Sequence, residues 1–340
     1  MTDEALTPVQ PSIARKAVFI SWQPQNTRSE ALAKHFGARI CHLHAFGFKQ
    51  VAVAPLKYVV LTIRTFRILW REQPEISFVL NPPFIAGLVV WAYTRLRGGC
   101  YILDSHTAAF LDRKWTWLGF LHRFLARHAL VSIVTNEHLG KMVESWGGDY
   151  FVIGDIPTDF PARLTHGLVR PHVVVINTFA SDEPIDQVLA AAAKLPDVSF
   201  SVTGDLRRCP AKTRSSAPSN LSFTGFIPMQ DYFDLLYSSD VAVVLTRRNF
   251  TMQRGGYESA SLEIPIVTSD WPLLRDTFSD AAAYSDNSST SIAKCVRSVL
   301  DDYETYKAAV RRLKGERRLK WADIEQRFRK KYLGKAEAQK

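Results

Sequence analysis

The segment from residue 251 to residue 270, TMQRGGYESASLEIPIVTSD, carries residue types that suit the binding of a phosphorylated ligand. It follows an apolar run at 241–245 that predicts a strand, and a loop with two glycines leads into a predicted helix at 256–262. Backbone amides at the start of a helix have no partner within the helix, and the helix dipole favours negative charge there. The segment therefore predicts an anion-binding loop at the end of a buried strand.

Four residues of this segment have candidate roles. Gly255 and Gly256 would let a diphosphate approach the backbone, and Arg254 beside them would pair with phosphate oxygens. Glu258, in the first turn of the predicted helix, would accept hydrogen bonds from ribose hydroxyls. A helix-capping carboxylate after an ordinary glycine loop would give the same pattern, so this alternative stays open.

A second candidate site follows the predicted strand at 100–103, where Asp104 and His106 stand two residues apart. His106 could donate a hydrogen bond or carry developing charge, with Asp104 orienting its ring. The alternative is an aspartate that caps a helix beside a surface histidine. No third ligand stands at a convincing spacing, so a metal site is not predicted.

The loop at 21–30 after the first predicted strand combines polar, aromatic and cationic residues. Trp22 would stack on a sugar ring and Arg28 would bind a phosphate of an acceptor. Ordinary turn chemistry with a helix cap is the alternative interpretation.

The predicted elements alternate in a way that brings these residues to strand ends. Short apolar runs of strand type alternate with helical segments from 17 to 153, and the alternation resumes from 172 to 269. This pattern predicts an α/β fold with doubly wound parallel sheets, whose ligand sites lie at the carboxyl ends of the strands. The proline-rich stretch 155–171 is the expected linker. The expected parts are a domain at 1–165, a domain at 166–301 and a basic helical segment at 302–340 that packs across both.

The composition is that of an ordinary globular protein of the cytoplasm. The 340 residues are 46% hydrophobic and 22% charged, which excludes a short secreted module and a disordered chain. The four cysteines stand far apart with no Cys-x-x-Cys pair, so neither a disulfide framework nor a zinc site is predicted. The N-terminal residues lack the apolar stretch of an export signal, and no apolar run is long enough to span a bilayer.

Positive charge is concentrated at the two ends of the chain. The formal net charge of +10 divides into +6 for residues 1–165, −3 for 166–301 and +7 for 302–340. A basic surface attracts nucleic acid, anionic lipid or phosphorylated substrates. No zinc-finger, RRM or basic-zipper motif accompanies the charge, so nucleic acid is not an expected partner. The stretch 115–128 mixes aromatic residues with arginines and could lie on an anionic membrane, although packing of an amphipathic helix is the simpler interpretation.

Three segments of the second half resemble the donor-binding domain of GT-B glycosyltransferases, nearest to the retaining family 4. Tyr257-Glu258, a short helix, Pro265 and then Ile-Val-Thr-Ser-Asp are similar to the family's donor-binding signature. The segments 202–205, VTGD, and 221–229, LSFTGFIPM, resemble the strand end and the strand-turn that lie beside the nucleobase. In order and spacing the resemblance covers about 100 residues of the second domain, whereas the first domain agrees only in its strand-helix alternation.

The resemblance implies two Rossmann-like domains that face each other across a cleft, with a nucleotide-sugar held mainly by the second. Together with the residue chemistry above, it gives the expected donor-binding residues as Glu258, Gly255, Gly256, Arg254, Arg247, Gly204 and Phe226. His106 and Asp104 would be catalytic, and Trp22 and Arg28 would contact the acceptor.

The implied reaction moves a sugar from a nucleotide-sugar to a hydroxyl of a glycan or lipid-linked acceptor, with retention, as in polysaccharide or glycoconjugate biosynthesis. No metal ion and no cofactor are required beyond the nucleotide-sugar, which is a substrate. The expected location is the cytoplasm, with peripheral contact at the inner face of the membrane.

Two departures from the family pattern keep other functions open. Family 4 members carry a glutamate eight positions before the one matched by Glu258, where this chain has Phe250. In many members the first strand of the second domain leads to a Gly-Arg and then a Lys that hold the diphosphate, and 177–184 contains neither cation. Arg247, Arg248 and Arg254 are the near candidates for that charge. The alternatives are a non-catalytic GT-B-like binding or assembly subunit and, with no extra acidic pair to support it, a nucleotide-sugar epimerase.

Overall fold

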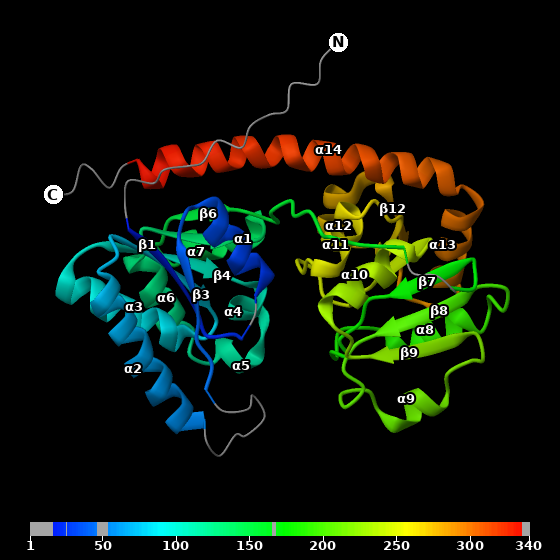
Figure 1. The fold of residues 1–340 in the computed structure, drawn as a ribbon, viewed down its shortest axis with the longest axis horizontal. Coiled ribbons are helices and arrows are strands. Elements are labelled where there is room, and N and C mark those ends of the chain that lie inside the picture. Colours follow the sequence, from blue (N-terminus) through cyan, green and yellow to red (C-terminus); the bar gives the residue numbers. More distant parts are fainter. Residues whose placement is uncertain (1–15, 25, 46–53, 165–167, 335–340) are drawn as a thin grey trace, which may run out of the picture. The chain divides into compact units, whose positions relative to one another are not determined.

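A computed structural model describes residues 16–24, 26–45, 54–164 and 168–334, which divide into two compact units (Figure 1). The first unit comprises residues 1–156 and 323–340, and the second comprises 157–322. The sequence analysis had expected the boundaries between the parts of the chain after residues 165 and 301. Residues 1–15, where no export signal was expected, lie outside the described part.

Over its described residues the first unit contains a six-stranded parallel sheet in the order β2-β1-β3-β4-β5-β6. Its strands are β1 (Ala17–Ser21), β2 (Arg39–His42), β3 (Ile76–Asn81), β4 (Cys100–Ser105), β5 (Val131–Val134) and β6 (Tyr150–Val152). Its helices are α1 (Thr27–His35), α2 (Ala54–Glu72), α3 (Phe84–Arg97), α4 (Thr107–Leu111), α5 (Arg113–Thr116), α6 (Gly119–His128) and α7 (Glu137–Ser145). Every residue of β1 and β3 is buried, as expected for parallel strands covered on both faces.

Helices α2, α3 and α6 cover one face of this sheet. Leu61, Val90 and Leu125 from these helices pack on the strand residues Val79 and Leu103. On the other face Phe19 stacks on Phe78 with ring centroids 5.7 Å apart. Each helix thus buries the apolar stripe that its periodicity predicts.

The second unit, over its described residues, also has a six-stranded parallel sheet, in the order β12-β11-β10-β7-β8-β9. Its strands are β7 (His172–Val175), β8 (Ser199–Thr203), β9 (Leu221–Gly225), β10 (Val241–Val244), β11 (Ile266–Ser269) and β12 (Ala282–Ser285). Its helices are α8 (Ile185–Ala192), α9 (Ala211–Ser215), α10 (Met229–Ser238), α11 (Arg254–Ser261), α12 (Pro272–Phe278) and α13 (Ser289–Asp301), with one 3-10 turn, η2 (Ser279–Ala281).

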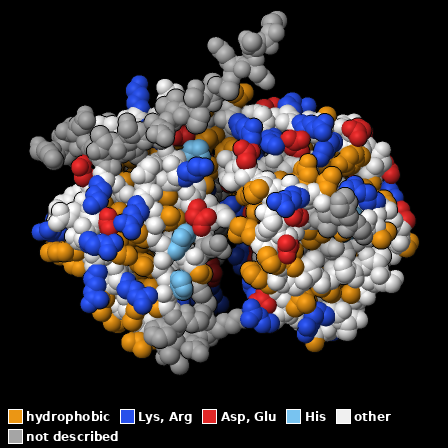
Figure 2. Space-filling model, viewed as in Figure 1, with side chains coloured by type: hydrophobic (Ala, Val, Ile, Leu, Met, Phe, Trp, Pro, Cys, Tyr) orange, Lys and Arg blue, Asp and Glu red, His pale blue; other side chains and the backbone are white. Residues whose placement is uncertain are grey.

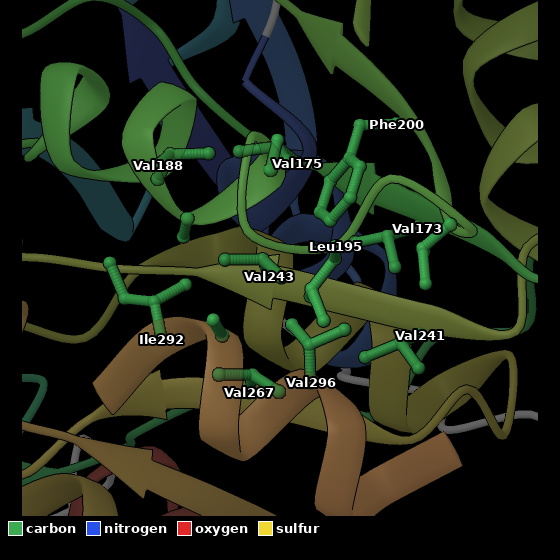
Figure 3. Close-up of a cluster of buried hydrophobic side chains, with 14 of the residues drawn as sticks. Val173, Val175, Val188, Leu195, Phe200, Val241, Val243, Val267, Ile292 and Val296 are labelled. Carbon is green, nitrogen blue, oxygen red and sulfur yellow. The ribbon is translucent and has the colours of Figure 1, made fainter. Parts of the chain in front are cut away.

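Alternate residues of the central strands face opposite sides of the second sheet. Val173 and Val243 point toward α8 and α13 and join the largest apolar cluster of this unit (Figure 3). Val174 and Ala242, their neighbours in the sequence, join a second cluster with α10 on the opposite face. This period of two is the pattern that the apolar runs predict for a strand.

Helix α14 (Tyr303–Phe328) begins in the second unit and ends in the first, and the π-helical turn η3 (Arg329–Leu333) follows it. Within the second unit Val310 is fully buried in a cluster with Phe278. Within the first unit Phe328 lies 4.6 Å from Phe36, measured between ring centroids, and contacts Phe151. The helix predicted from 302 onward is therefore present.

The structure differs from the sequence-based expectation at several elements, among them the helix expected at 115–128 and strand β12. The single helix expected at 115–128 is divided into α5 and α6, because Asp112 caps α5 and Leu118 leaves the helical conformation before Gly119. Strand β12 was not predicted, since its sequence Ala-Ala-Tyr-Ser lacks the β-branched residues typical of strands. None of the described helices combines the length and the apolar character needed to cross a membrane.

Acid is expected to weaken the second unit through His172, the first residue of β7. Its ring contacts the hydroxyls of Ser239 at 2.9 Å and Ser201 at 3.0 Å, and burial lowers its pKa to about 4. A folded-state pKa below the unfolded value means that the contribution is present above about pH 6.5 and is lost as the pH falls through about 4. The expected loss over this range is about 3 kcal/mol, measured by urea unfolding at a series of pH values.

His172→Gln provides the matched control for this pH dependence, because glutamine offers polar atoms to both serines and does not titrate. The variant should show a flatter dependence of unfolding free energy on pH between 6.5 and 4 than the parent protein. An unchanged slope would remove His172 as a source of the acid sensitivity.

Candidate active site

In each sheet the strand order reverses at one point, and ligands of doubly wound folds bind at the carboxyl ends of the strands beside such a point. In the second unit the reversal lies between β7 and β10. The loops that follow these strands, 176–184 and 245–253, are joined by a 2.9 Å hydrogen bond from Thr246 Oγ1 to Asp182 Oδ2. The second loop leads directly into α11, so the residues predicted to bind phosphate and ribose do lie at this edge.

Glu258 is 8% exposed and both of its carboxylate oxygens have protein partners. Arg254 Nε donates to Oε1 at 2.6 Å and the Tyr232 hydroxyl donates to Oε2 at 2.6 Å. Burial and then the Glu258 carboxylate raise the pKa of Tyr232 well above its ordinary value, so the phenol stays a donor. A carboxylate oxygen has a second lone pair, and the capacity to accept a ribose hydroxyl therefore remains.

The two glycines of α11 have an explanation in packing. A Cβ at Gly255 would lie 2.7 Å from Ile176, and a Cβ at Gly256 would lie 2.6 Å from Phe278. Both glycines are buried, so they allow the start of α11 to lie against its neighbours. Their predicted role in admitting a diphosphate stays a prediction.

The loop after β7 is organised by the buried carboxylate of Glu183. It accepts hydrogen bonds from the backbone amides of Thr178 at 2.7 Å and Ala180 at 3.0 Å. Gln253 Nε2 approaches the same carboxylate at 3.3 Å. Burial raises the pKa of Glu183 above its ordinary value, although the two amides stabilise its charged form. The Glu183 carboxylate thus accepts hydrogen bonds from the amides of the loop after β7. In many members of the resembled family this loop instead carries cations that bind the diphosphate.

Arg247 and Arg248 differ in their surroundings. Arg248 Nη2 lies 3.8 Å from Asp182, whereas the exposed Arg247 lines an open pocket of about 460 Å³. The other lining residues are Gln187, Trp271, Asp286, Asn287 and Ser288. Sequence reasoning missed this pocket, although Trp271 stands two residues after the predicted strand that ends at Ser269.

Gly204 and Phe226 lie at the carboxyl ends of β8 and β9. Gly204 has φ of +126°, and a Cβ there would lie 2.4 Å from the carbonyl oxygen of Asn177, so only glycine fits. Phe226 is 85% exposed, which leaves its ring free to contact a ligand. Their predicted place beside a nucleobase is not tested by these contacts.

In the first unit Asp104 lies at the end of β4 and is completely buried. Arg28 Nε donates to its Oδ1 at 3.1 Å, and His106 Nε2 lies 3.1 Å from its Oδ2. Burial would raise the pKa of Asp104, but the Arg28 guanidinium and then His106 outweigh burial and hold it below its ordinary value. The His106 side chain is 27% exposed, so the ring is oriented by a charged carboxylate and is still accessible.

Arg28 and Trp22 have structural partners that the sequence did not reveal. The remaining Arg28 nitrogens donate to the carbonyls of Ile153 and Gly154, both at 2.8 Å. Trp22 is 3% exposed, packs on Tyr58 in the core and donates from Nε1 to a threonine hydroxyl. These positions correct the acceptor assignment: the Arg28 donors are engaged within the unit, and the Trp22 ring is covered by core side chains.

No group of three or more His, Cys, Asp or Glu side chains in the described ranges is arranged to hold a metal ion. None of the four cysteines, all of which lie within those ranges, forms a disulfide.

Comparison with known proteins identifies the class of fold. Residues 186–330 match the model of a family described as glycosyl transferase-like. Sucrose-phosphate synthase from Thermosynechococcus elongatus superposes with a TM-score of 0.71 at 14% identity, covering 94% of this chain and 98% of that one. Anabaena HepE in complex with UDP and glucose gives 0.70 at 12% identity over 93% and 98%. The chain therefore has the GT-B fold of two Rossmann-like units.

The fold is shared by enzymes of another class. A putative UDP-N-acetylglucosamine 2-epimerase from Listeria monocytogenes superposes with a TM-score of 0.61 at 12% identity, over 87% of this chain and 90% of that one. No curated protein matches the chain by sequence. The resemblance to GT-B glycosyltransferases is confirmed, and membership of family 4 stays a prediction.

Proposed function

We propose that this protein transfers a sugar from a nucleotide-sugar to a hydroxyl of a glycan or lipid-linked acceptor, with retention of configuration. The observation that carries the proposal is the Arg254–Glu258–Tyr232 cluster at the reversal point of the second sheet. It supplies a fixed carboxylate for ribose hydroxyls and a guanidinium for phosphate at the edge where such folds bind nucleotides. The glycosyl transferase-like match over 186–330 supports the same reading.

A uridine diphosphate sugar is the first donor to test. Two proteins with this fold have structures with uridine nucleotides. They are HepE with UDP-glucose and the pneumococcal O-GlcNAc transferase GtfA with UDP and GlcNAc. We propose that positive charge for the leaving diphosphate comes from Arg254 and Arg247, since the β7 loop uses its amides on Glu183. Stabilisation of the leaving group then replaces a protein nucleophile, and no metal ion or cofactor is invoked.

His106 is the proposed catalytic residue on the first unit. Its ring is held by the Asp104 carboxylate and can donate to a sugar hydroxyl or stabilise charge that develops on the sugar. The proposed location is the cytoplasm, where thiols stay reduced, and none of the four cysteines forms a disulfide.

Glu258→Gln is expected to weaken binding of the nucleotide-sugar by about 1 to 3 kcal/mol, or about 5- to 150-fold. The amide keeps one acceptor oxygen but replaces the other with a donor, which faces the Tyr232 hydroxyl or the Arg254 guanidinium. Calorimetric titration with UDP-glucose and with UDP measures the change.

Glu263→Gln serves as the control, because Glu263 is paired with Arg311 and Lys314 and is a glutamate of the same unit outside the site. Its donor affinity should equal that of the parent protein. Unchanged affinity in Glu258→Gln, with an intact thermal transition, would remove Glu258 from the donor site.

A non-catalytic binding subunit is the second candidate, and two observations favour it. Phe250 occupies the place of a family acidic residue, and Glu183 uses amides that a diphosphate would otherwise contact. Such a subunit would bind a nucleotide-sugar, or another anionic ligand, without turning it over.

A further inference from the structure

Four helices of the first unit carry a strong excess of positive charge. Over α2, α3, α5 and α6 there are ten Lys and Arg residues and a single acidic residue, Glu72. Glu72 is 9% exposed and is paired with Lys16, Arg39 and Arg71, so it offers little negative charge to the surface. The cations are Lys57, Arg64, Arg67, Arg71, Arg95, Arg97, Arg113, Lys114, Arg123 and Arg127.

Large apolar side chains are exposed among these cations. On α2, Leu56 and Val59 are each 54% exposed and Ile63 is 44% exposed. Steps of three and four residues place them on one side of the helix, opposite the buried side that packs on the sheet. Near the start of α6, Trp117 is 74% exposed and Phe120 is 63% exposed. Exposed aromatic and aliphatic side chains of this size, gathered in one region, indicate an interaction surface.

The two groups belong to the same side of the first unit. Helices α2 and α6 pack on the two flanks of α3, and all three cover one face of the sheet. The groups also lie toward the same end of this face. Tyr58 of α2 stacks on Trp22 just after β1, and Trp115 contacts Phe84 at the start of α3. The basic apolar face is defined here by Leu56, Val59, Ile63, Trp117 and Phe120 with the surrounding cations. In Figure 2 the part of the first unit that carries α2 shows orange apolar atoms among blue Lys and Arg side chains.

We propose that the basic apolar face binds the surface of a membrane that contains anionic phospholipid. Apolar and aromatic side chains bury at the boundary between headgroups and acyl chains, and Lys and Arg side chains pair with headgroup phosphates. A nucleic acid would contact the cations but would leave the aliphatic stripe of α2 in water, which makes it the poorer fit. None of the described helices can span a bilayer, so the proposed contact is peripheral, with the face lying on the membrane surface. The proposal extends the membrane contact considered for 115–128 to α2, and it stands without the proposed function.

Vesicle flotation of the full chain tests the proposal. One set of vesicles contains phosphatidylcholine alone, and the other contains phosphatidylcholine with 30% phosphatidylglycerol, which is anionic. Binding is expected to the anionic vesicles, to be much weaker on the neutral ones and to fall as salt is raised. Equal partition to both vesicles, or none to either, would overturn it. If the protein instead forms a dimer that Val59→Glu dissociates, the face binds a second copy and the membrane proposal fails.

Two pairs of variants test the residues. Val59→Glu with Phe120→Glu should reduce binding to anionic vesicles at least tenfold, whereas Leu319→Glu, which changes a 77% exposed leucine of α14, should leave it unchanged.

Arg67→Gln with Arg123→Gln should reduce binding to anionic vesicles by about 25-fold, at roughly fivefold for each charge. Lys212→Gln with Lys294→Gln removes two exposed charges of the second unit and should have no effect. Equal losses in the test and control pairs would refute the assignment of the face. If a variant fails to fold, the proposal is tested by the parent protein alone, whose binding to anionic vesicles is compared with its binding to neutral ones.

Discussion

Arg28→Met is expected to lower the free energy of unfolding of the first unit by about 3 to 5 kcal/mol at neutral pH. Methionine matches the length of the arginine stem but leaves the fully buried Asp104 carboxylate without its cation. It also removes the donors to the carbonyls of Ile153 and Gly154, which tie α1 to the chain after β6. Urea unfolding followed by circular dichroism measures the loss.

The pH dependence of this loss separates a buried charge from general damage. In the parent protein the pKa of Asp104 is held below its ordinary value, so its contribution is present at neutral pH and is lost as the pH falls. In the variant the isolated carboxyl favours protonation, and the difference between variant and parent should shrink in acid. Arg39→Met, which changes a 60% exposed arginine paired with Glu72, should cost less than about 1 kcal/mol. A similar small cost for Arg28→Met would contradict the role of the buried pair.

His106→Ala is expected to lower the turnover of a nucleotide-sugar by about 10²- to 10⁴-fold while leaving the affinity for nucleoside diphosphate unchanged. The ring lies on the first unit and is oriented by Asp104, whereas the proposed nucleotide contacts are on the second unit. A residue that acts only on the reacting sugar changes turnover, and a residue that holds the nucleotide changes affinity.

Two further variants make this test specific. His106→Gln keeps a donor toward Asp104 but cannot transfer a proton, so it should retain the parent's thermal stability and share the loss of turnover. His44→Ala changes an exposed histidine of the same unit and should have full turnover. Near-normal turnover in His106→Ala would show that the histidine only begins helix α4 at the surface.

Most of the fold was predictable from the sequence because the signal for most of the buried strands is local. The runs at 17–21 and 241–245 are continuous and apolar, as buried parallel strands require, and they form β1 and β10. Strand β12 escaped prediction because α12 and α13 pack on it, whereas its own sequence contains no β-branched residue.

The candidate site was predictable in position and less so in chemistry. Glu258 and His106 follow strands at the expected edges, since the end of a strand can be read from the sequence. The partners of Arg28 are 76 and 125 positions away, and no local pattern shows such contacts. Trp22 resembled a ligand-stacking residue because its burial depends on α2, a helix that begins more than 30 positions later.

The most direct test of the central claim is release of sugar from a panel of UDP-, GDP- and CMP-linked sugars, with and without added glycan or lipid-linked acceptors. The account predicts that one donor binds saturably, is slowly hydrolysed alone and transfers its sugar when an acceptor is present, and that Glu258→Gln and His106→Ala both reduce the transfer. Conversion of the donor to its epimer would assign the chain to the other enzyme class with this fold. Saturable binding of a donor with no hydrolysis, transfer or epimerisation would contradict the enzyme and favour a binding subunit.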